Sequence, residues 1–239
     1  MEIFGIRAVM EAINSSKDID KVFIQIGLKG SLISTLESII RKNKINFSYV
    51  PKQKLDRLSK KNHQGVIARI SPIKLLDLDQ IDSIITENGA PLLLILDQIN
   101  DVRNFGAIIR TAEVAGVTAV VIQNSSSAPI NSDTIKTSAG AIFNIPICKV
   151  NHIKDAIYHF KSLGISIVSA SEKSDKNLYD TDFKKPVAIV IGSENKGINK
   201  SVLKISDEIV KLPMYGKIES LNVSVASGIF LYEAIRQRI

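Results

Sequence analysis

Apolar runs that recur after Pro91 constrain the fold of this chain more than any other feature. They are LLLILD (92–97), AVVIQ (119–123), IPICKV (145–150), ISIVSA (165–170), VAIVIG (187–192) and DEIVKLPM (207–214). Each run has the length of a strand, and helical patterns separate most of them. Strands that are apolar on both faces are typical of a parallel sheet covered by helices on both sides. The sequence therefore predicts an α/β fold.

A smaller α/β unit precedes this sheet. Helical patterns at 5–14, 31–44 and 51–59 alternate with strand patterns at 22–27, 46–50 and 65–70. The next stretch, SPIKLLDLDQIDSIITENGAP, has prolines near both ends, an acidic middle and an Asn-Gly turn signal. We expect residues 1–71 to form one domain, residues 72–90 a linker with one short helix, and residues 91–239 a second domain.

Lysine and arginine are concentrated in the N-terminal part of the chain. Residues 1–74 contain 14 of the 31 Lys and Arg but 6 of the 24 Asp and Glu, which leaves 17 and 18 for the remainder. The densest groups are Arg41, Lys42 and Lys44, then Lys52, Lys54, Arg57, Lys60 and Lys61. Such an excess suits a polyanion, most commonly nucleic acid. A solubilising surface explains the charges equally well, since no RNA-recognition aromatic signature or zinc finger accompanies them.

Several classes of protein are disfavoured. Cys148 is the single cysteine, so an internal disulfide is impossible, and the chain has no CxxC or HExxH pattern to indicate a metal site. The N-terminus lacks the basic leader and apolar core of a signal peptide, and no run of about 18 apolar residues occurs. We expect a cytoplasmic protein with no metal and no membrane segment.

Ligands of parallel sheets bind beyond the carboxyl ends of the strands, and the loop after 92–97 carries suitable residues. Asn104 can cap a helix beginning at Phe105, and Arg110 interrupts the apolar series of that helix. Six residues place Asn104 and Arg110 about 120° apart around the helix axis, so their roles should differ. A partly buried Arg110 would need a phosphate or carboxylate partner. Taken singly, the two residues are an ordinary cap and a surface cation.

Two further loops follow strand patterns. GSENKGIN contains Gly192 and Gly197, which permit tight turns, and Glu194, which places a carboxylate at the exit of the strand. It fits neither a Walker A nor a GxGxxG motif. In KLPMYGKIESLNVSVASGIF (211–230), Ser220 stands at a potential N-cap, Asn222 follows it, and small residues keep the next helix thin. This segment alone favours an ordinary strand–loop–helix connection, but three such loops together favour a ligand site.

Together these loops resemble the SpoU group of RNA ribose 2′-O-methyltransferases, in the SPOUT class. The motifs are NFGAIIRTAEVAG (104–116), IGSENKG (191–197) and LPMYGKIESLNVSVASGIFLYEAIRQR (212–238). The earlier GIRAVMEAI and HQGVIARI look like the N-terminal substrate-binding domain of this family, of the ribosomal-protein L30e/L7Ae type. The resemblance covers nearly the whole chain. It is closest to enzymes that methylate a guanosine ribose in the peptidyl-transferase region of 23S rRNA.

The resemblance implies a SPOUT domain with a deep trefoil knot that binds S-adenosylmethionine, RNA as substrate, and an obligate homodimer. The catalytic positions of the family correspond to Asn104, Arg110, Glu194, Ser220 and Asn222, and its cofactor-binding backbone to Gly192, Leu212 and Leu221. Arg110 is the proposed base of the family. Because a guanidinium keeps its positive charge near neutral pH, contact of Arg110 with a substrate phosphate is equally favoured. Glu194 is then expected to orient Arg110 or a loop amide, and Ser220 and Asn222 to fix the ribose and the cofactor loop.

One position departs from the family, and several alternatives stay open. Val102 stands where members usually carry proline, which is expected to loosen the loop before Asn104. Sister enzymes that act on tRNA share the three motifs, and resistance-type relatives modify a different ribosomal site. A non-catalytic RNA-binding module is the remaining class. The additional N-terminal domain favours ribosomal RNA, whereas the motifs leave the target nucleotide open.

Overall fold

A computed structural model of the chain describes residues 2–14, 18–60, 62–70, 73–218 and 220–239. The chain divides into two compact units, Met1–Lys74 and Leu75–Ile239. Lys61 and the boundary expected between residues 71 and 72 lie outside the described residues. Residues 75–90, which we expected to be part of a linker, belong to the second unit. Their helix α4 (Leu78–Thr86) buries Ile81 and Ile85 in the core of that unit.

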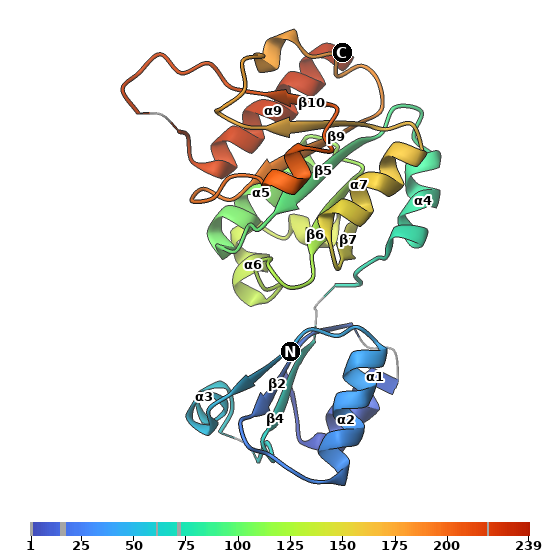
Figure 1. Cartoon of the computed structure of the whole chain (residues 1–239), viewed down its shortest axis with the longest axis vertical. Helices are drawn as coiled ribbons and strands as arrows, with labels where there is room; N and C mark the ends of the chain where they lie inside the picture. Colours follow the sequence, from blue (N-terminus) through green and yellow to red (C-terminus); the bar gives the residue numbers. More distant parts are fainter. Residues whose placement is uncertain (1, 15–17, 61, 71–72, 219) are drawn as a thin grey trace. The chain divides into compact units, whose positions relative to one another are not determined.

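The N-terminal unit is a four-stranded mixed sheet in the order β1-β4-β2-β3 (Figure 1). Its elements are β1 (Glu2–Phe4), α1 (Ile6–Asn14), β2 (Ile19–Gln25), α2 (Ser31–Lys42), β3 (Phe47–Val50), α3 (Lys52–Leu58) and β4 (Val66–Ile70). Helices α1 and α2 cover one face, where Val22 and Ile24 of β2 join the core. Phe23 points to the other face and packs with Leu55 of α3. The predicted helices and strands are confirmed with small shifts at their ends, whereas β1 has no counterpart in the prediction.

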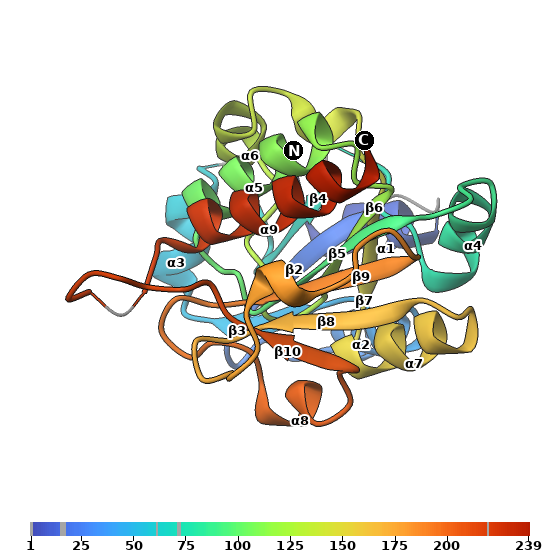
Figure 2. The ribbon, with the colours of Figure 1, turned by 90° about the horizontal axis from the view of Figure 1, so that it is seen from above.

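The C-terminal unit is built on six parallel strands in the order β10-β8-β9-β5-β6-β7, which confirms the predicted parallel α/β fold. The strands are β5 (Leu92–Asp97), β6 (Ala119–Gln123), β7 (Ile147–Val150), β8 (Ser166–Ala170), β9 (Val187–Gly192) and β10 (Glu208–Val210). The helices are α4, α5 (Val102–Val114), α6 (Ser132–Thr137), α7 (Ile153–Ser162), α8 (Lys200–Leu203) and α9 (Val223–Arg238), with 3-10 turns η1 (Ala141–Phe143) and η2 (Leu178–Asp180). Figure 2 shows α5 and α9 on one side of the sheet and α7 on the other. Every residue of β5 is buried, as its continuous apolar run predicts.

Three expected element ends are wrong. Of the run DEIVKLPM, residues Glu208–Val210 alone form a strand. Helix α5 begins at Val102 instead of Phe105, because Oδ1 of Asp101 accepts a hydrogen bond from the backbone N–H of Asn104 at 2.8 Å and caps the helix. Helix α9 begins at Val223, and its N-cap is Asn222 instead of Ser220.

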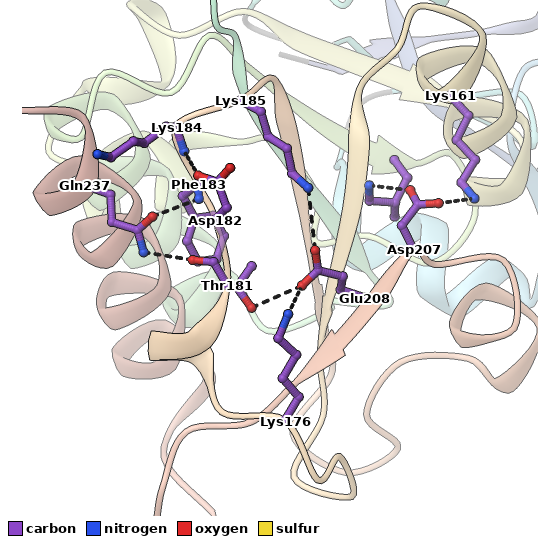
Figure 3. Close-up of polar contacts among 11 residues, drawn as sticks. Lys161, Lys176, Thr181, Asp182, Phe183, Lys184, Lys185, Asp207, Glu208 and Gln237 are labelled. Carbon is purple, nitrogen blue, oxygen red and sulfur yellow. Dashed lines mark hydrogen bonds and ion pairs between the residues drawn. The ribbon is translucent and has the colours of Figure 1, made fainter.

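A network of polar side chains ties the C-terminal end of α9 and the segment before β9 to β10 (Figure 3). We call Lys176, Thr181, Lys185, Glu208 and Gln237 the Glu208 network. Oε2 of Glu208 accepts hydrogen bonds from Lys176 at 2.5 Å and from the Thr181 hydroxyl at 3.3 Å, while Nζ of Lys185 lies 3.6 Å from Oε1. Nε2 of Gln237 donates to the Thr181 carbonyl at 2.9 Å. These contacts fix the end of α9 against the sheet.

No helix in the described part of the chain is long and apolar enough to cross a membrane.

Candidate active site

The three polar loops meet at the carboxyl edge of β5 and β9. Nδ2 of Asn222 donates to Oδ1 of Asn104 at 3.0 Å and to Oε1 of Glu194 at 2.6 Å. We call Asn104, Glu194 and Asn222 the strand-end cluster. It joins α5, the loop after β9 and the start of α9, which are far apart in the sequence. The structure therefore brings together three of the five residues predicted to serve catalysis.

Asn222 uses both ends of its side-chain amide. Oδ1 accepts a hydrogen bond from the backbone N–H of Ser224 at 3.0 Å and caps α9, which leaves Nδ2 to reach the other two loops. Oε1 of Glu194 also accepts from the backbone N–H of Val223 at 3.3 Å. A carboxylate at a helix N-terminus is favourable, because the unsatisfied amides there carry partial positive charge. Of the two partners expected for Glu194, the structure shows the backbone amide.

A cavity of about 160 Å³ opens beside the cluster. Its walls are residues 98–101 and Asn104 after β5, residues 193–196 after β9, and Val223 of α9. Polar side chains and loop backbone line it at the edge where parallel sheets hold their ligands. The cavity therefore gives the strand-end cluster access to a bound molecule.

Close backbone approach shapes the loop after β9. A Cβ atom built on Gly192 would overlap the backbone of Gly197 and Ile198, so no other residue fits there without movement. The backbone N–H of Gly197 donates to the Ser193 carbonyl at 2.8 Å, and the φ of Gly197 is 64°. Close packing thus requires glycine at 192, and the left-handed turn at 197 favours it.

Asp97 is a residue of this edge that the sequence analysis missed. It ends β5 with 2% of its surface exposed, and its Oδ2 accepts a hydrogen bond from the backbone N–H of Asn199 at 2.7 Å. Burial raises the pKa of the Asp97 carboxyl, and the hydrogen bonds from Asn199 and the Gln98 side chain oppose that rise only in part. Asp97 anchors the returning end of the 193–199 loop. An acidic residue that ends a wholly apolar strand is the signal that could have identified it.

Arg110 and Ser220 lie outside the hydrogen-bonded cluster. Arg110 is exposed on the third turn of α5, and within the described part of the chain no hydrogen bond or ion pair holds its guanidinium. Because Arg110 is not buried, its charge needs no partner within the protein. Ser220 is exposed in the segment between β10 and α9, which extends outward as a long loop (Figure 2). Both side chains are accessible to a ligand.

The two leucines expected near the cofactor lie on that same loop. Leu212 is half-buried and Leu221 is 39% exposed. Neither residue lines the cavity beside the strand-end cluster, and neither does Gly192. The expected cofactor positions are thus not among the walls of this cavity.

Two observations bear on other chemistry. Among the residues that the structure describes, no group of three or more His, Cys, Asp or Glu is placed to hold a metal ion. Burial, with smaller contributions from Asp77 and Asp82, raises the pKa of the Cys148 thiol to about 12, so this thiol stays protonated near neutral pH. Cys148 contributes to the core of the second unit.

Comparisons with known proteins identify the family of the chain. The SpoU rRNA Methylase family matches residues 91–232, and the family described as RNA 2′-O ribose methyltransferase substrate binding matches residues 3–76. A 23S rRNA (guanosine-2′-O-)-methyltransferase RlmB from Vibrio vulnificus is 35% identical, covering 99% of this chain and 97% of its own. A putative TrmH family tRNA/rRNA methyltransferase, YacO, from Bacillus subtilis is 34% identical, covering 99% and 95%.

A solved structure extends the likeness to the fold. The crystal structure of an AdoMet-bound rRNA methyltransferase from Sinorhizobium meliloti matches with a TM-score of 0.63 at 21% identity, covering 100% of this chain and 87% of that one. At this identity the likeness shows the methyltransferase fold alone. The family match covers most of the chain, and the relatives align over nearly all of it. The chain therefore belongs to the SpoU rRNA methylase family.

Proposed function

We propose that this protein transfers a methyl group from S-adenosylmethionine to the ribose 2′-hydroxyl of a guanosine in 23S rRNA. The observation that carries the proposal is the strand-end cluster, in which one side chain, Asn222, joins the three motifs beside an open cavity. The names of the RlmB relatives supply the substrate. The strand-end cluster holds the loop after β9 and the start of α9 in position.

The residues expected to hold S-adenosylmethionine suit that group. When bound, it supplies a methyl group already activated by a positively charged sulfur. The backbone of Gly197 and Ile198 packs directly against Gly192 and so fixes the end of β9, where the family places its cofactor. Leu212 and Leu221 present partly exposed apolar surface for an adenine ring. The trefoil knot implied by the resemblance stays a prediction.

Arg110 acts in this proposal as a phosphate-binding cation. Its side chain is exposed and without a partner among the described residues, so an RNA phosphate can reach it. A guanidinium keeps its positive charge near neutral pH, which makes it a poor base and a good partner for phosphate. The phosphate held by Arg110 orients the target ribose, whose hydroxyl proton passes to solvent as its oxygen takes the methyl group, while Ser220 contacts the ribose from the outer loop. Orientation of this kind supplies much of the acceleration of a group transfer.

We further propose a homodimer formed through α9. Val225 and Tyr232 are each 51% exposed, and with the half-buried Ile229 they form one stripe along the helix. Gly228 faces the other way, toward Thr111 of α5. Sedimentation of the protein should give twice the chain mass, and a Val225→Glu, Tyr232→Glu variant should sediment as a monomer. A monomeric wild type would contradict the dimer. We also propose a cytoplasmic location, which a ribosomal RNA substrate supports.

Transfer RNA is the alternative substrate, because the B. subtilis relative is named for both RNAs. The separate match of residues 3–76 to a substrate-binding family favours ribosomal RNA. The test incubates the protein with methyl-labelled S-adenosylmethionine and either a 23S rRNA transcript or unmodified tRNA. Because a 2′-O-methyl group blocks alkaline cleavage of the next phosphodiester, protected positions map the product. One protected guanosine in 23S rRNA is expected, and label in tRNA alone, or in neither RNA, would contradict the proposal.

A further inference from the structure

Three cations gather around one aromatic ring on the N-terminal sheet. Nζ of Lys21 lies 5.6 Å from the centroid of the Phe23 ring, Nζ of Lys54 lies 5.8 Å from it, and Cζ of Arg69 lies 5.6 Å from it. The three come from β2, α3 and β4. We call Lys21, Lys54 and Arg69 the Phe23 cation cluster. It lies on the sheet face that carries α3, opposite α1 and α2.

The sheet register brings two of these charges directly against each other. Lys21 of β2 and Arg69 of β4 are paired residues of an antiparallel ladder. Like charges directly opposite in such a ladder destabilise it, and Lys54 adds a third charge from the helix above. Contacts with the ring recover part of this cost, since cations are attracted to an aromatic face. The fold therefore holds the three charges together against their mutual repulsion.

Acidic residues balance the cluster only in part. Oε1 of Glu2 approaches Arg69 to 3.9 Å, a loose ion pair. Partial burial lowers the pKa of the Lys21 ammonium, the charges of Lys54 and Arg69 lower it further, and Asp20 opposes them. The cluster thus keeps excess positive charge in a setting where water solvates it incompletely. An anion that enters between the three side chains relieves this repulsion.

The buried Phe23 ring restricts which part of a nucleic acid can bind to the cluster. Phe23 is 6% exposed, so a nucleobase has no free face on which to stack. Beside the ring, Lys54 is exposed and Arg69 is half-buried, so phosphate oxygens can reach both cations. We infer that the Phe23 cation cluster binds a backbone phosphate of the RNA substrate and places RNA on the α3 face of the N-terminal sheet. The inference rests on the proposed function for the identity of the polyanion.

A charge-matched pair of variants of the full-length protein tests the inference. The first variant is Lys21→Gln, Lys54→Gln, Arg69→Gln. The second is Arg7→Gln, Lys29→Gln, Lys74→Gln, which removes the same charge from exposed positions of the same unit that lie outside its densest basic groups. Affinity for a 23S rRNA transcript is measured from low to physiological salt. Each lost phosphate contact lowers the slope of log affinity against log salt by about 0.7–0.9.

The cluster variant should bind about tenfold more weakly at low salt, with the slope reduced by about 0.7–0.9, whereas the control changes affinity by less than about threefold. Wild-type affinity and slope in the cluster variant would overturn the inference, as would an equal loss in both variants. The unfolding temperature of the cluster variant should not fall, because repulsion is removed. If it does fall, Lys21→Gln alone gives the same test, with a smaller loss of affinity and of slope in the same direction.

Methyl-transfer kinetics separate this inference from the proposed function. With saturating RNA the cluster variant should keep the wild-type kcat and show a raised KM for RNA. If the wild type methylated RNA and the cluster variant had an unchanged KM for RNA, the inference would be wrong and the proposed function would stand. A wild type that methylates no RNA would defeat the proposed function, while the salt slopes would still report on the cluster.

Discussion

Two polar regions of the C-terminal unit use hydrogen bonds of similar length for different purposes. In the Glu208 network, two lysines and a hydroxyl surround one carboxylate, so its charge is neutralised by the chain itself (Figure 3). In the strand-end cluster, the partners recorded for Glu194 among the described residues are the uncharged amides of Asn222 and Val223. The first region stabilises the position of α9. The second keeps charge and hydrogen-bonding capacity available beside a cavity, as a binding site requires.

The carboxyl groups of the two regions also differ in the direction of their pKa shifts. Burial alone would raise the pKa of Glu208, but the hydrogen bond and charge of Lys176, with the charge of Lys185, outweigh it and lower the pKa. Asp97, beneath the candidate site, has amide donors instead of cations, and burial raises its pKa. The ionised form of Glu208 therefore stabilises the fold. The ionised form of Asp97 destabilises it, although the same carboxylate accepts the hydrogen bond that anchors the 193–199 loop.

The largest predicted effect is that of Arg110→Ala. If Arg110 orients the substrate through a phosphate, its loss should lower kcat by about 10²-fold or more. The unfolding temperature should stay at the wild-type value, because Arg110 is exposed and has no partner in the described chain. Methyl transfer to 23S rRNA and thermal unfolding measure the two effects. Lys204→Ala, another exposed cation of the same unit, should change neither. A fully active Arg110→Ala enzyme would remove Arg110 from the mechanism.

The next effect separates the two uses of Asn222. Serine caps a helix about as well as asparagine. It has no counterpart of the Nδ2 group that donates to Asn104 and Glu194. Asn222→Ser should therefore lower kcat by about 10- to 100-fold with little change in stability. Asn222→Ala should in addition lower the free energy of unfolding by about 1 kcal/mol, through loss of the cap. Full activity in Asn222→Ser would mean that the cluster only caps α9.

Gly192→Ala should have a smaller effect, and on stability. The added methyl group meets the backbone of Gly197 and Ile198, which cannot rotate away as a side chain can. We expect a loss of about 1–3 kcal/mol in the free energy of unfolding, measured by urea denaturation. Gly216→Ala is the matched control, since nothing lies within 4 Å of the added atom. Equal stability of the two variants would show that the loop after β9 adapts easily.

Local pattern was sufficient to predict the sheet. The runs at 92–97, 119–123 and 187–192 form strands with the predicted bounds, because strands buried on both faces leave a continuous apolar signature. The same pattern overextended the last strand, where Lys211 keeps a single bridge, to Asn177, and Pro213 has no N–H to donate. Apolar periodicity records burial, and it is less informative about where a ladder ends.

The site was harder to predict, because its contacts join residues far apart in the sequence. Neighbouring candidates for the caps of α5 and α9 all have suitable side chains, and the backbone geometry selects Asp101 and Asn222. That choice frees the Asn104 side chain to meet Asn222, 118 residues away. Asp97 was missed for the same reason, since its partner Asn199 lies 102 residues further along the chain. The motifs named most of the polar residues, and only the fold showed which of them touch.

The smallest predicted effect is a pH dependence that tests the contrast between the two carboxyl groups. Because the pKa of Glu208 is lowered in the folded state, its stabilising contribution is complete above the ordinary glutamate pKa and disappears as pH falls through the lowered value. Glu208→Gln should therefore unfold at a lower temperature than the wild type at neutral pH, by the equivalent of less than about 1 kcal/mol, since the group is partly exposed. This difference should vanish under acidic conditions.

Asp97→Asn should behave in the opposite way. Its amide oxygen can still accept the hydrogen bond from Asn199, while the buried charge is gone. Because the pKa of Asp97 is raised in the folded state, the wild type loses stability as pH rises from the ordinary aspartate pKa through the raised value. Thermal unfolding across that range should therefore show the variant gaining on the wild type with rising pH, while Glu208→Gln falls behind. If the unfolding temperatures of both variants, relative to the wild type, changed in the same direction with pH, the ionised form of Asp97 would stabilise the fold as that of Glu208 does. The contrast between the two carboxyl groups would then be wrong.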